Sequence, residues 1–173
     1  MIISGEEIKK RIGKEIFIEP FDPVRINPNS YNLKLHDELL VYEGEVLDMK
    51  KDNSSRRIHI PKEGFVLSPD KVYLARIKEH IEVKNLVPFL EGRSSIGRLG
   101  LHVHVTAGLG QVGSKGFWTL ELHAVQPIRI YAGIEICQIY FLEIKGEYTN
   151  YSNKYFDSKD IQTSFLYKEL DLD

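Results

Sequence analysis

The stretch FWTLELHAV (residues 117–125), followed closely by IRIYAG (128–133) and IEICQIYFLEI (134–144), decides the fold class. Each run is short, is rich in β-branched and aromatic residues, and ends at a glycine, a proline or a polar turn, which is typical of β-strands. Further runs of the same kind lie upstream, in LHVHVTAG (101–108) and between residues 56 and 83. Many short strands with few helical segments predict an all-β fold with minor α content, arranged as an antiparallel sandwich or barrel.

The N-terminal part of the chain differs from this pattern. Ser4 and Glu7 have the spacing of a capping box, in which each side chain satisfies a free backbone amide at the start of a helix. They predict one short helix that ends near Gly13. Three prolines between residues 20 and 28 then exclude a continuous helix, and residues 31–36 alternate apolar and polar side chains as a half-buried strand does.

The composition excludes several classes of protein. A chain of 173 residues with 42% hydrophobic and 28% charged residues fits one globular domain, which we expect to span residues 1–173. A net charge of −2 argues against a nucleic-acid-binding protein, which normally carries a basic face. The chain has no apolar stretch of membrane-spanning length and no signal peptide, so no membrane partner is expected. The single cysteine, Cys137, excludes an internal disulfide and favours a cytoplasmic location.

One carboxylate, Glu121, stands inside a run that otherwise reads as a buried strand. Burying a lone charge is costly unless the charge is paired or neutralised. Two explanations are open at this point. Glu121 lies on the exposed face of an edge strand, or it is a general acid/base in a nucleotide pocket.

The segment EGRSSIGRLG (residues 91–100) combines the groups that a triphosphate requires. Arg93 and Arg98 flank two adjacent hydroxyls, Ser94 and Ser95, within a turn that contains glycine. Arginine binds phosphate through two parallel hydrogen bonds, and free amides in a turn add further donors. The alternative is a polar turn that opens an amphipathic segment, and composition alone favours neither.

Metal-binding patterns are sparse in this sequence. His102 and His104 have the spacing of two ligands on one face of a strand, but no cysteine cluster and no third well-placed ligand accompany them. The zinc-deaminase signature, H-x-E with P-C-x-x-C, does not occur, and neither does a Walker A loop. We therefore expect any deaminase activity to proceed without protein-bound zinc.

Five segments, taken together and in this order, resemble a known family: INPNSYNLKLHDEL (26–39), GRSSIGRLGLHVHVTAG (92–108), GFWTLEL (116–122), PIRIYAGIEICQIYF (127–141) and NKYFDSKDIQTSFLYK (153–168). They resemble the dCTP deaminase branch of the trimeric dUTPase superfamily, over almost the whole chain. The most similar members are the dCTP deaminases that also hydrolyse the triphosphate and release dUMP. The resemblance implies a distorted jelly roll or β-barrel with a short N-terminal helix and a C-terminal arm over about residues 147–173. It also implies a homotrimer whose active sites are shared between subunits.

The resemblance implies a role for each matching residue. Glu121 is the general base that activates water for attack on C4 of cytosine, and Arg98 and Ser94 organise it. The triphosphate of the nucleotide brings Mg²⁺ with it, so no protein metal site is implied. The residues implied to bind substrate are Arg93, Ser95, Val105, Thr106, Ala107, Gln111, Lys154 and Tyr155. The product is dUTP, or dUMP where hydrolysis of the triphosphate follows.

Two positions depart from the family pattern, and both belong to the sugar subsite. Relatives have an aspartate where this chain has Gln111, and a large aromatic or aliphatic side chain where it has Ser114. An amide cannot act as a base, and a serine offers the sugar no apolar surface. Ser158, in the arm, likewise stands where relatives often have a glutamine. We expect dCTP deamination; the alternatives are a dUTP diphosphatase without deaminase activity, a shifted nucleotide preference, and a nucleotide-binding protein without catalysis.

Overall fold

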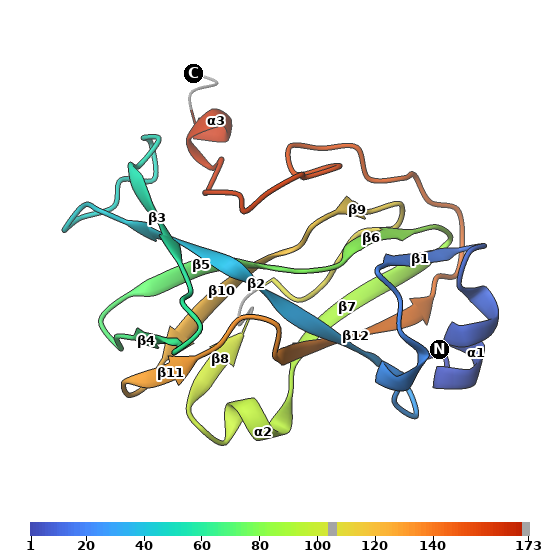
Figure 1. Cartoon of the computed structure of the whole chain (residues 1–173). Coiled ribbons are helices and arrows are strands. Elements are labelled where there is room, and N and C mark those ends of the chain that lie inside the picture. The colour runs from blue at the N-terminus through green and yellow to red at the C-terminus, as the bar shows by residue number, and fades with distance from the viewer. Residues whose placement is uncertain (104–106, 171–173) are drawn as a thin grey trace.

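The computed structural model describes residues 1–103 and 107–170, and within them strands predominate (Figure 1). The strands are β1 (Ile16–Glu19), β2 (Tyr31–Tyr42), β3 (Ser55–His59), β4 (Phe65–Leu67), β5 (Val72–Ile77), β6 (His80–Val83), β7 (Leu86–Gly92), β8 (Leu101–Val103), β9 (Lys115–Gly116), β10 (Thr119–Ala124), β11 (Ile128–Ile130) and β12 (Glu135–Glu143). The helices are α1 (Gly5–Arg11), α2 (Ser94–Gly97) and α3 (Tyr167–Leu170), with a 3-10 turn at Pro23–Arg25. The prediction of an all-β fold with minor α content is confirmed.

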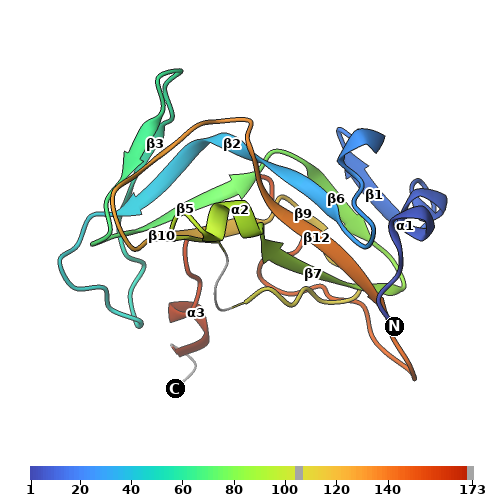
Figure 2. The same cartoon turned by 90° about the horizontal axis from the view of Figure 1, so that it is seen from below.

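Three sheets wrap around the core, as Figure 2 shows from below. The largest has the strand order β7-β12-β2-β5-β10-β8, with β3 also paired to β2; the others are β1-β6-β9 and β11-β4. Strand β2 belongs to both halves of the large sheet, because its first half pairs with β12 and its second half with β3 and β5. The register of β2 against β5 shifts between Leu35 and Leu39. Such an irregularity bends a strand and lets the sheet curve towards closure.

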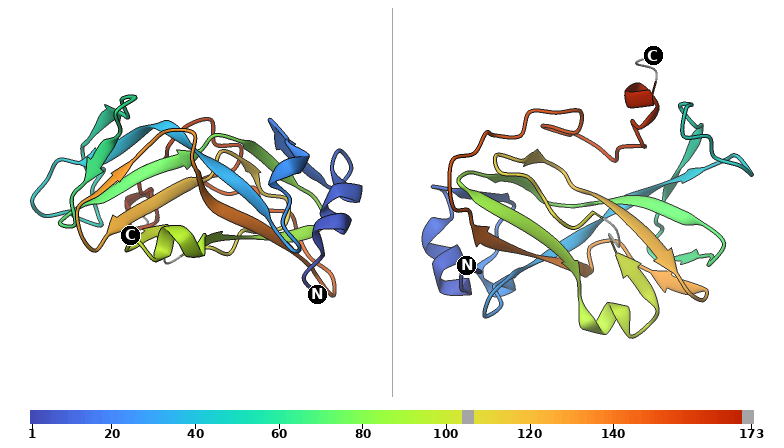
Figure 3. Two further views of the ribbon diagram at one scale, coloured as in Figure 1. Left: turned by 60° about the horizontal axis from the view of Figure 1, so that its bottom comes forward. Right: turned by 180° about the vertical axis from the view of Figure 1, so that it is seen from behind.

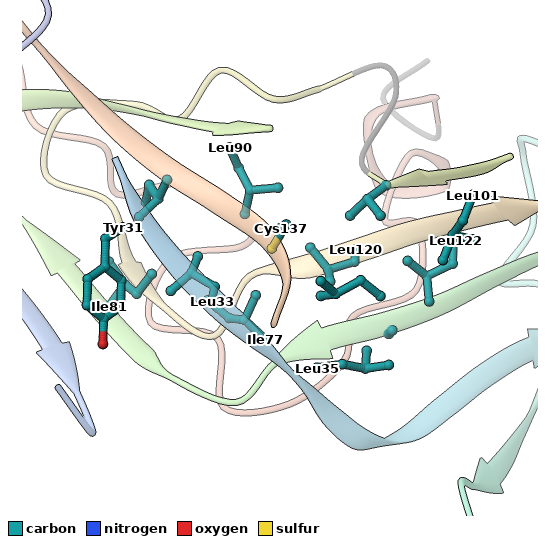
Figure 4. Close-up of a cluster of buried hydrophobic side chains, with 14 of the residues drawn as sticks. Tyr31, Leu33, Leu35, Ile77, Ile81, Leu90, Leu101, Leu120, Leu122 and Cys137 are labelled. Carbon is teal, nitrogen blue, oxygen red and sulfur yellow. The ribbon is translucent and has the colours of Figure 1, made fainter. Parts of the chain in front are cut away.

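The core is built from alternate residues of these strands, which is why the runs of β-branched and leucine residues are short and regularly interrupted. Figure 4 shows its centre, where side chains from β2, β5, β10 and β12 meet. Cys137 is fully buried among them, and burial raises the pKa of its thiol, so it packs as a small hydrophobic residue. The fully buried large side chains include Tyr31, Leu33, Leu35, Ile77, Ile81, Leu90 and Phe141.

The N-terminal helix forms as its capping residues predict. Ser4 is the N-cap of α1 and its hydroxyl accepts a hydrogen bond from the Glu7 amide at 3.2 Å. Ile8 is fully buried, so α1 packs one face against the core. Gly13 follows the helix with φ of +77°, a left-handed conformation that glycine adopts without steric cost.

A buried ion pair lies beneath the 3-10 turn. The side chains of Arg25 and Glu79 are 3% and 0% exposed, and they contact each other directly. Arg25 also donates to the carbonyls of Asn32 (3.3 Å) and Pro20 (3.0 Å), and Glu79 accepts from the Lys34 amide at 3.1 Å. The pair therefore ties the turn, the start of β2 and the β5–β6 connection together.

His36, on β2, lies in a partly buried polar cluster on the same sheet. Its Nε2 is 2.7 Å from Nη2 of Arg76, and since a guanidinium can only donate, Nε2 accepts and the ring is neutral. Burial, and then the positive charge of Arg76, lower the pKa of His36 below its ordinary value of 6.5. The opposing effect of the nearby acids Asp37, Glu38 and Asp160 does not offset them.

This arrangement predicts a pH dependence of stability. As the pH falls below about 6.5, the unfolded chain protonates His36 while the folded chain does not. The free energy of unfolding should therefore decrease over that range and level off once the pH is below the lowered pKa. Urea titrations between about pH 7.5 and pH 5.5 measure this, with His36→Gln expected to show a flatter dependence. An equally steep dependence in that variant would contradict the assignment.

The segment after β12 does not fray but folds back on the rest of the chain, as the views in Figure 3 show. The Tyr151 amide donates to the Val112 carbonyl at 2.8 Å, and the Phe117 amide donates to the Ser158 carbonyl at 2.9 Å. Gly116 permits this approach, because a Cβ at this position would lie 2.5 Å from the Ser158 nitrogen. The described residues of the arm are thus an ordered part of the fold. Among the described residues, no helix is long and apolar enough to span a membrane.

Candidate active site

Glu121 lies in the middle of β10, which is an internal strand rather than an edge strand. Strand β10 pairs with β5 on one side and with β8 on the other. Along β10 the residues alternate between buried and half-buried, and Glu121 shares the half-buried face with Thr119 and His123. Its Oε2 atom is inaccessible to solvent, and the residue directly opposite on β5, Leu74, is buried. The reading of Glu121 as a solvent-facing residue of an edge strand is therefore wrong.

The predicted phosphate-binding turn is helix α2 and its flanks. Ser94, Ser95 and Arg98 are exposed, and Arg93 is half-buried at the N-cap. Arg93 donates to the Glu135 carbonyl at 2.7 Å and lies 3.4 Å from its carboxylate, so it is anchored to β12 within the same chain. The turn thus presents two hydroxyls and the Arg98 guanidinium outward, on a single helical turn that leads directly into β8.

The loop between β8 and β9 contains the remaining predicted base and sugar contacts. Val105 and Thr106 lie outside the described residues, while Ala107 and Gln111 are exposed. Ser114 is 8% exposed, and its hydroxyl makes no hydrogen bond to any residue that the structure describes. Its backbone is held by β6, because the Val83 amide donates to the Ser114 carbonyl at 3.0 Å. Ser114 is therefore part of the packing of this loop in a single chain. Of the two residues that differ from the family pattern, Gln111 and Ser114, only Gln111 is accessible to solvent.

The arm residues predicted to contact substrate are engaged within the arm itself. The Lys154 ammonium contacts the Glu169 carboxylate of α3 and lies 5.2 Å from the centre of the Tyr155 ring. Tyr155 stacks on Phe165, with ring centroids 5.2 Å apart. These two residues are therefore adjacent and ordered, but the described contacts join them to the arm rather than to α2 or β10.

Two of the histidines near Glu121, His102 and His123, lie in the part of the chain that the structure describes. His102 and His123 lie directly opposite each other on β8 and β10 and their rings stack, with centroids 6.1 Å apart. His104, the other member of the predicted pair, lies outside the described residues. Within residues 1–103 and 107–170, no cluster of three or more His, Cys, Asp or Glu side chains is arranged to hold a metal ion.

The fold brings some predicted residues together and leaves others apart. Helix α2 precedes β8, the hydrogen-bonded neighbour of β10, and leads into it at Leu101, which lies opposite Ala124, three residues along β10 from Glu121. Lys154 and Tyr155 lie on the arm, which reaches this sheet through Ile161 and Gln162. The basic residues that receive the arm, Arg57 and Arg76, were not predicted, because nothing in their local sequence distinguishes them from solvated strand residues.

Comparison with known proteins gives a consistent result along the chain. The family model described as dCTP deaminase-like matches residues 2–144. A curated relative from Hathewaya histolytica is 59% identical over 172 residues, which cover 99% of this chain and 100% of that protein. One from Clostridium acetobutylicum is 61% identical over 170 residues, covering 98% of each. Both relatives are named "dCTP deaminase, dUMP-forming".

A solved structure supports the fold independently. The crystal structure of 2′-deoxycytidine 5′-triphosphate deaminase from Agrobacterium tumefaciens matches with a TM-score of 0.64 and 19% identity, over 81% of this chain and 47% of that one. The predicted fold type is thereby confirmed, although a likeness at this identity speaks for the fold alone. With the family model covering most of the chain and relatives near 60% identity over its full length, the chain belongs to the dCTP deaminase-like family.

Proposed function

We propose that this protein is an enzyme that deaminates dCTP, with Glu121 as the general base. The observation that carries the proposal is full-length similarity to relatives named dCTP deaminase, in a chain that also retains a carboxylate on the internal strand β10. In the reaction, water adds across the C4–N3 double bond of cytosine: Glu121 takes one proton of the water and delivers it to N3 as the oxygen bonds to C4. Glu121 then carries the proton of the new hydroxyl to the amine, the bond from C4 to the amine breaks, ammonia leaves and a carbonyl remains at C4. The alternative of a dUTP diphosphatase without deaminase activity is not favoured by these relatives.

We further propose that the triphosphate binds at α2. Ser94 and Ser95 offer hydroxyl donors, Arg98 offers an exposed guanidinium, and Arg93 is held in place by Glu135. These groups suit phosphate oxygens rather than a metal ion. Mg²⁺ would accordingly enter as part of the nucleotide complex, where it neutralises charge on the phosphates. Arg98 and Ser94 would also orient the substrate against Glu121.

The words "dUMP-forming" in the names of the relatives imply a second activity, the removal of two phosphates from the deaminated nucleotide. We propose that this chain, too, releases dUMP after deamination, by hydrolysis that splits pyrophosphate from the nucleotide. Of the two positions that differ from the family pattern, only Gln111 is accessible to the sugar that joins base and phosphates, so Gln111 affects how tightly the nucleotide is held rather than which carboxylate deaminates it.

The active assembly is proposed to be a homotrimer in the cytoplasm. In a single chain, α2, Ala107 and Gln111 face solvent, and a site that shields the bound nucleotide from bulk solvent requires a further surface over them. A neighbouring copy of the same chain is the simplest source of that surface. In this assembly the substrate, a nucleotide of the dCTP type, binds between neighbouring copies of the chain.

The proposed function is tested by following two products on two substrates. Ammonia and pyrophosphate are measured separately, with dCTP and then with dUTP as substrate. Release of both products from dCTP is expected. Pyrophosphate from dUTP with no ammonia from dCTP would instead identify a diphosphatase, and tight nucleotide binding without either product would identify a non-catalytic protein.

Gln111→Asp is predicted to lower KM for dCTP. A carboxylate accepts a stronger hydrogen bond from a sugar hydroxyl than an amide does, and a gain of about 1.4 kcal/mol corresponds to about a tenfold change in affinity. Because Gln111 is exposed, the substitution should leave the fold unchanged. Gln111→Asn, which has the length of aspartate but keeps the amide, is the matched control and should not lower KM. Equal KM values for all three proteins would place the sugar elsewhere.

A further inference from the structure

Three consecutive residues, Asp160, Ile161 and Gln162, attach the C-terminal arm to the sheet that contains Glu121. Their contacts are to β3, to β5 and to β10, the strand of Glu121. Upstream of them, the arm follows the loop around β9, where the Asp157 amide donates to the Lys115 carbonyl at 2.9 Å. It then contacts β3, β5 and β10 and continues to α3 (Figures 1 and 3). We call Asp160 and Ile161 the arm anchor.

Asp160 is held by arginines from two different strands. Its Oδ2 accepts a hydrogen bond from Nη2 of Arg57, on β3, at 2.7 Å, and its Oδ1 lies 3.6 Å from Nε of Arg76, on β5. The Arg76 side chain is only 12% exposed and is fixed by His36 and by the ring of Phe117, whose centre is 4.2 Å away. Partial burial acts to raise the pKa of Asp160, but the hydrogen bonds from Arg57 and from the Ile161 amide, together with the charges of Arg57 and Arg76, outweigh it and lower that pKa. The contact is therefore charged at neutral pH.

Ile161 and Gln162 bring the arm next to the proposed base. Ile161 is 5% exposed and packs in a small apolar cluster with Leu40 and Leu74. Leu74 is the residue directly opposite Glu121 across the β5–β10 pair. The Gln162 amide donates to the Thr119 hydroxyl at 2.9 Å, and Thr119 shares a face of β10 with Glu121. One contact therefore involves the residue opposite Glu121, and the other involves the residue two positions before Glu121 on β10.

We infer that Asp160 and Ile161 are positioning residues for the reaction, which hold the arm against the strand pair that carries Glu121. The inference rests on the proposed function. Without the anchor, the arm keeps its contacts near β9 but loses its attachment beside the base. The part of the arm that carries Lys154 and Tyr155, the substrate contacts that the family resemblance implies, is then no longer held in a defined position. The expected effect is on substrate binding, since Glu121 itself is unchanged.

Asp160→Asn removes the charge at constant size and tests the inference. KM for dCTP should rise about tenfold while kcat for ammonia release changes by less than about twofold, since loss of one charge-assisted contact is of that order. Asp160→Glu, which keeps the charge, should recover most of the affinity. Arg57→Ala should reproduce the rise in KM. Its neighbour on the same strand provides the matched control: Arg56 is 59% exposed and 4.0 Å from Glu43, away from the arm, so Arg56→Ala should leave KM unchanged.

A second measurement keeps the failure of this inference distinct from failure of the proposed function. If the parent protein releases no ammonia from dCTP, the proposed function fails, and dCTP binding by calorimetry takes the place of KM. About tenfold weaker binding in Asp160→Asn and Arg57→Ala, but not in Arg56→Ala, supports the anchor. Trypsin cleavage after Lys159 or Lys168 reports independently whether the arm has been released. Faster cleavage together with unchanged KM or affinity would overturn the inference, because the arm would then be detached without consequence for the nucleotide.

Discussion

Glu121→Gln is expected to reduce the rate of ammonia release from dCTP by about 10² to 10⁴, the usual range for loss of a general base. The amide has nearly the same shape as the carboxylate and fits the same position on β10 between Leu74 and β8. It cannot, however, take a proton from water. The chemical step should therefore slow while the pocket stays intact.

The substitution Glu121→Gln is informative because it should slow the chemical step without weakening the binding of dCTP. The affinity for dCTP, measured by calorimetry, should change little, since α2 and the arm are untouched. Glu143→Gln is the matched control: it removes a carboxylate of β12 whose described contact is to Arg11, at 3.1 Å, near the N-terminal helix. That variant should keep the parent rate. If Glu121→Gln also kept it, another group would have to activate the water and the proposed mechanism would be wrong.

The second large effect is predicted for the buried ion pair. Glu79→Ala should lower the free energy of unfolding by about 3–5 kcal/mol, because it leaves the charge of Arg25 buried without its partner. The Arg25 side chain is only 3% exposed and cannot reach water without displacing the 3-10 turn. The Lys34 amide, which donates to Glu79 at 3.1 Å, also loses its acceptor. Urea unfolding at neutral pH measures the change as a shift in the midpoint at constant slope.

An exposed ion pair on the same molecule provides a reference for the stability cost of Glu79→Ala. Arg56 and Glu43 are 59% and 51% exposed and 4.0 Å apart, so Arg56→Ala should cost less than about 1 kcal/mol. Replacing both members of the buried pair, as in Arg25→Met with Glu79→Leu, should cost less than Glu79→Ala alone, because no charge is then left without a partner. A cost for Glu79→Ala similar to that for Arg56→Ala would show that Arg25 reaches solvent after all.

Several features were predictable because their cause is local. The Ser4 half of the predicted capping box forms, because the Ser4 hydroxyl accepts from the amide of Glu7, three residues later; the Glu7 carboxylate accepts a hydrogen bond from Arg11 instead of capping the helix. The strands around Glu121 follow from alternation along the chain, which β10 shows residue by residue. The family, and with it the roles proposed for Glu121 and α2, follow from motifs that are also short and contiguous.

Other features depend on residues that are remote in the chain. Arg25 and Glu79 are 54 positions apart, and Arg57 and Asp160 are 103 apart. No periodicity or composition pairs them, since each looks like an ordinary charged residue of a strand or turn. The internal position of β10 likewise depends on which strands lie beside it. The alternation of buried and half-buried residues along a strand is the same at the centre of a sheet as at its edge, so it does not predict that position.

The amino-acid sequence by itself thus determined the class of fold, the family and the residues proposed to bind and deaminate the nucleotide. It could do so because local propensity, capping and motif spacing act over a few residues. Only the tertiary structure decided that Glu121 sits on an internal strand with one oxygen shielded from solvent, that a buried ion pair joins the turn to the sheet, and where the arm is attached. These are outcomes of strand order and packing, which bring distant side chains within bonding distance and which no local pattern records.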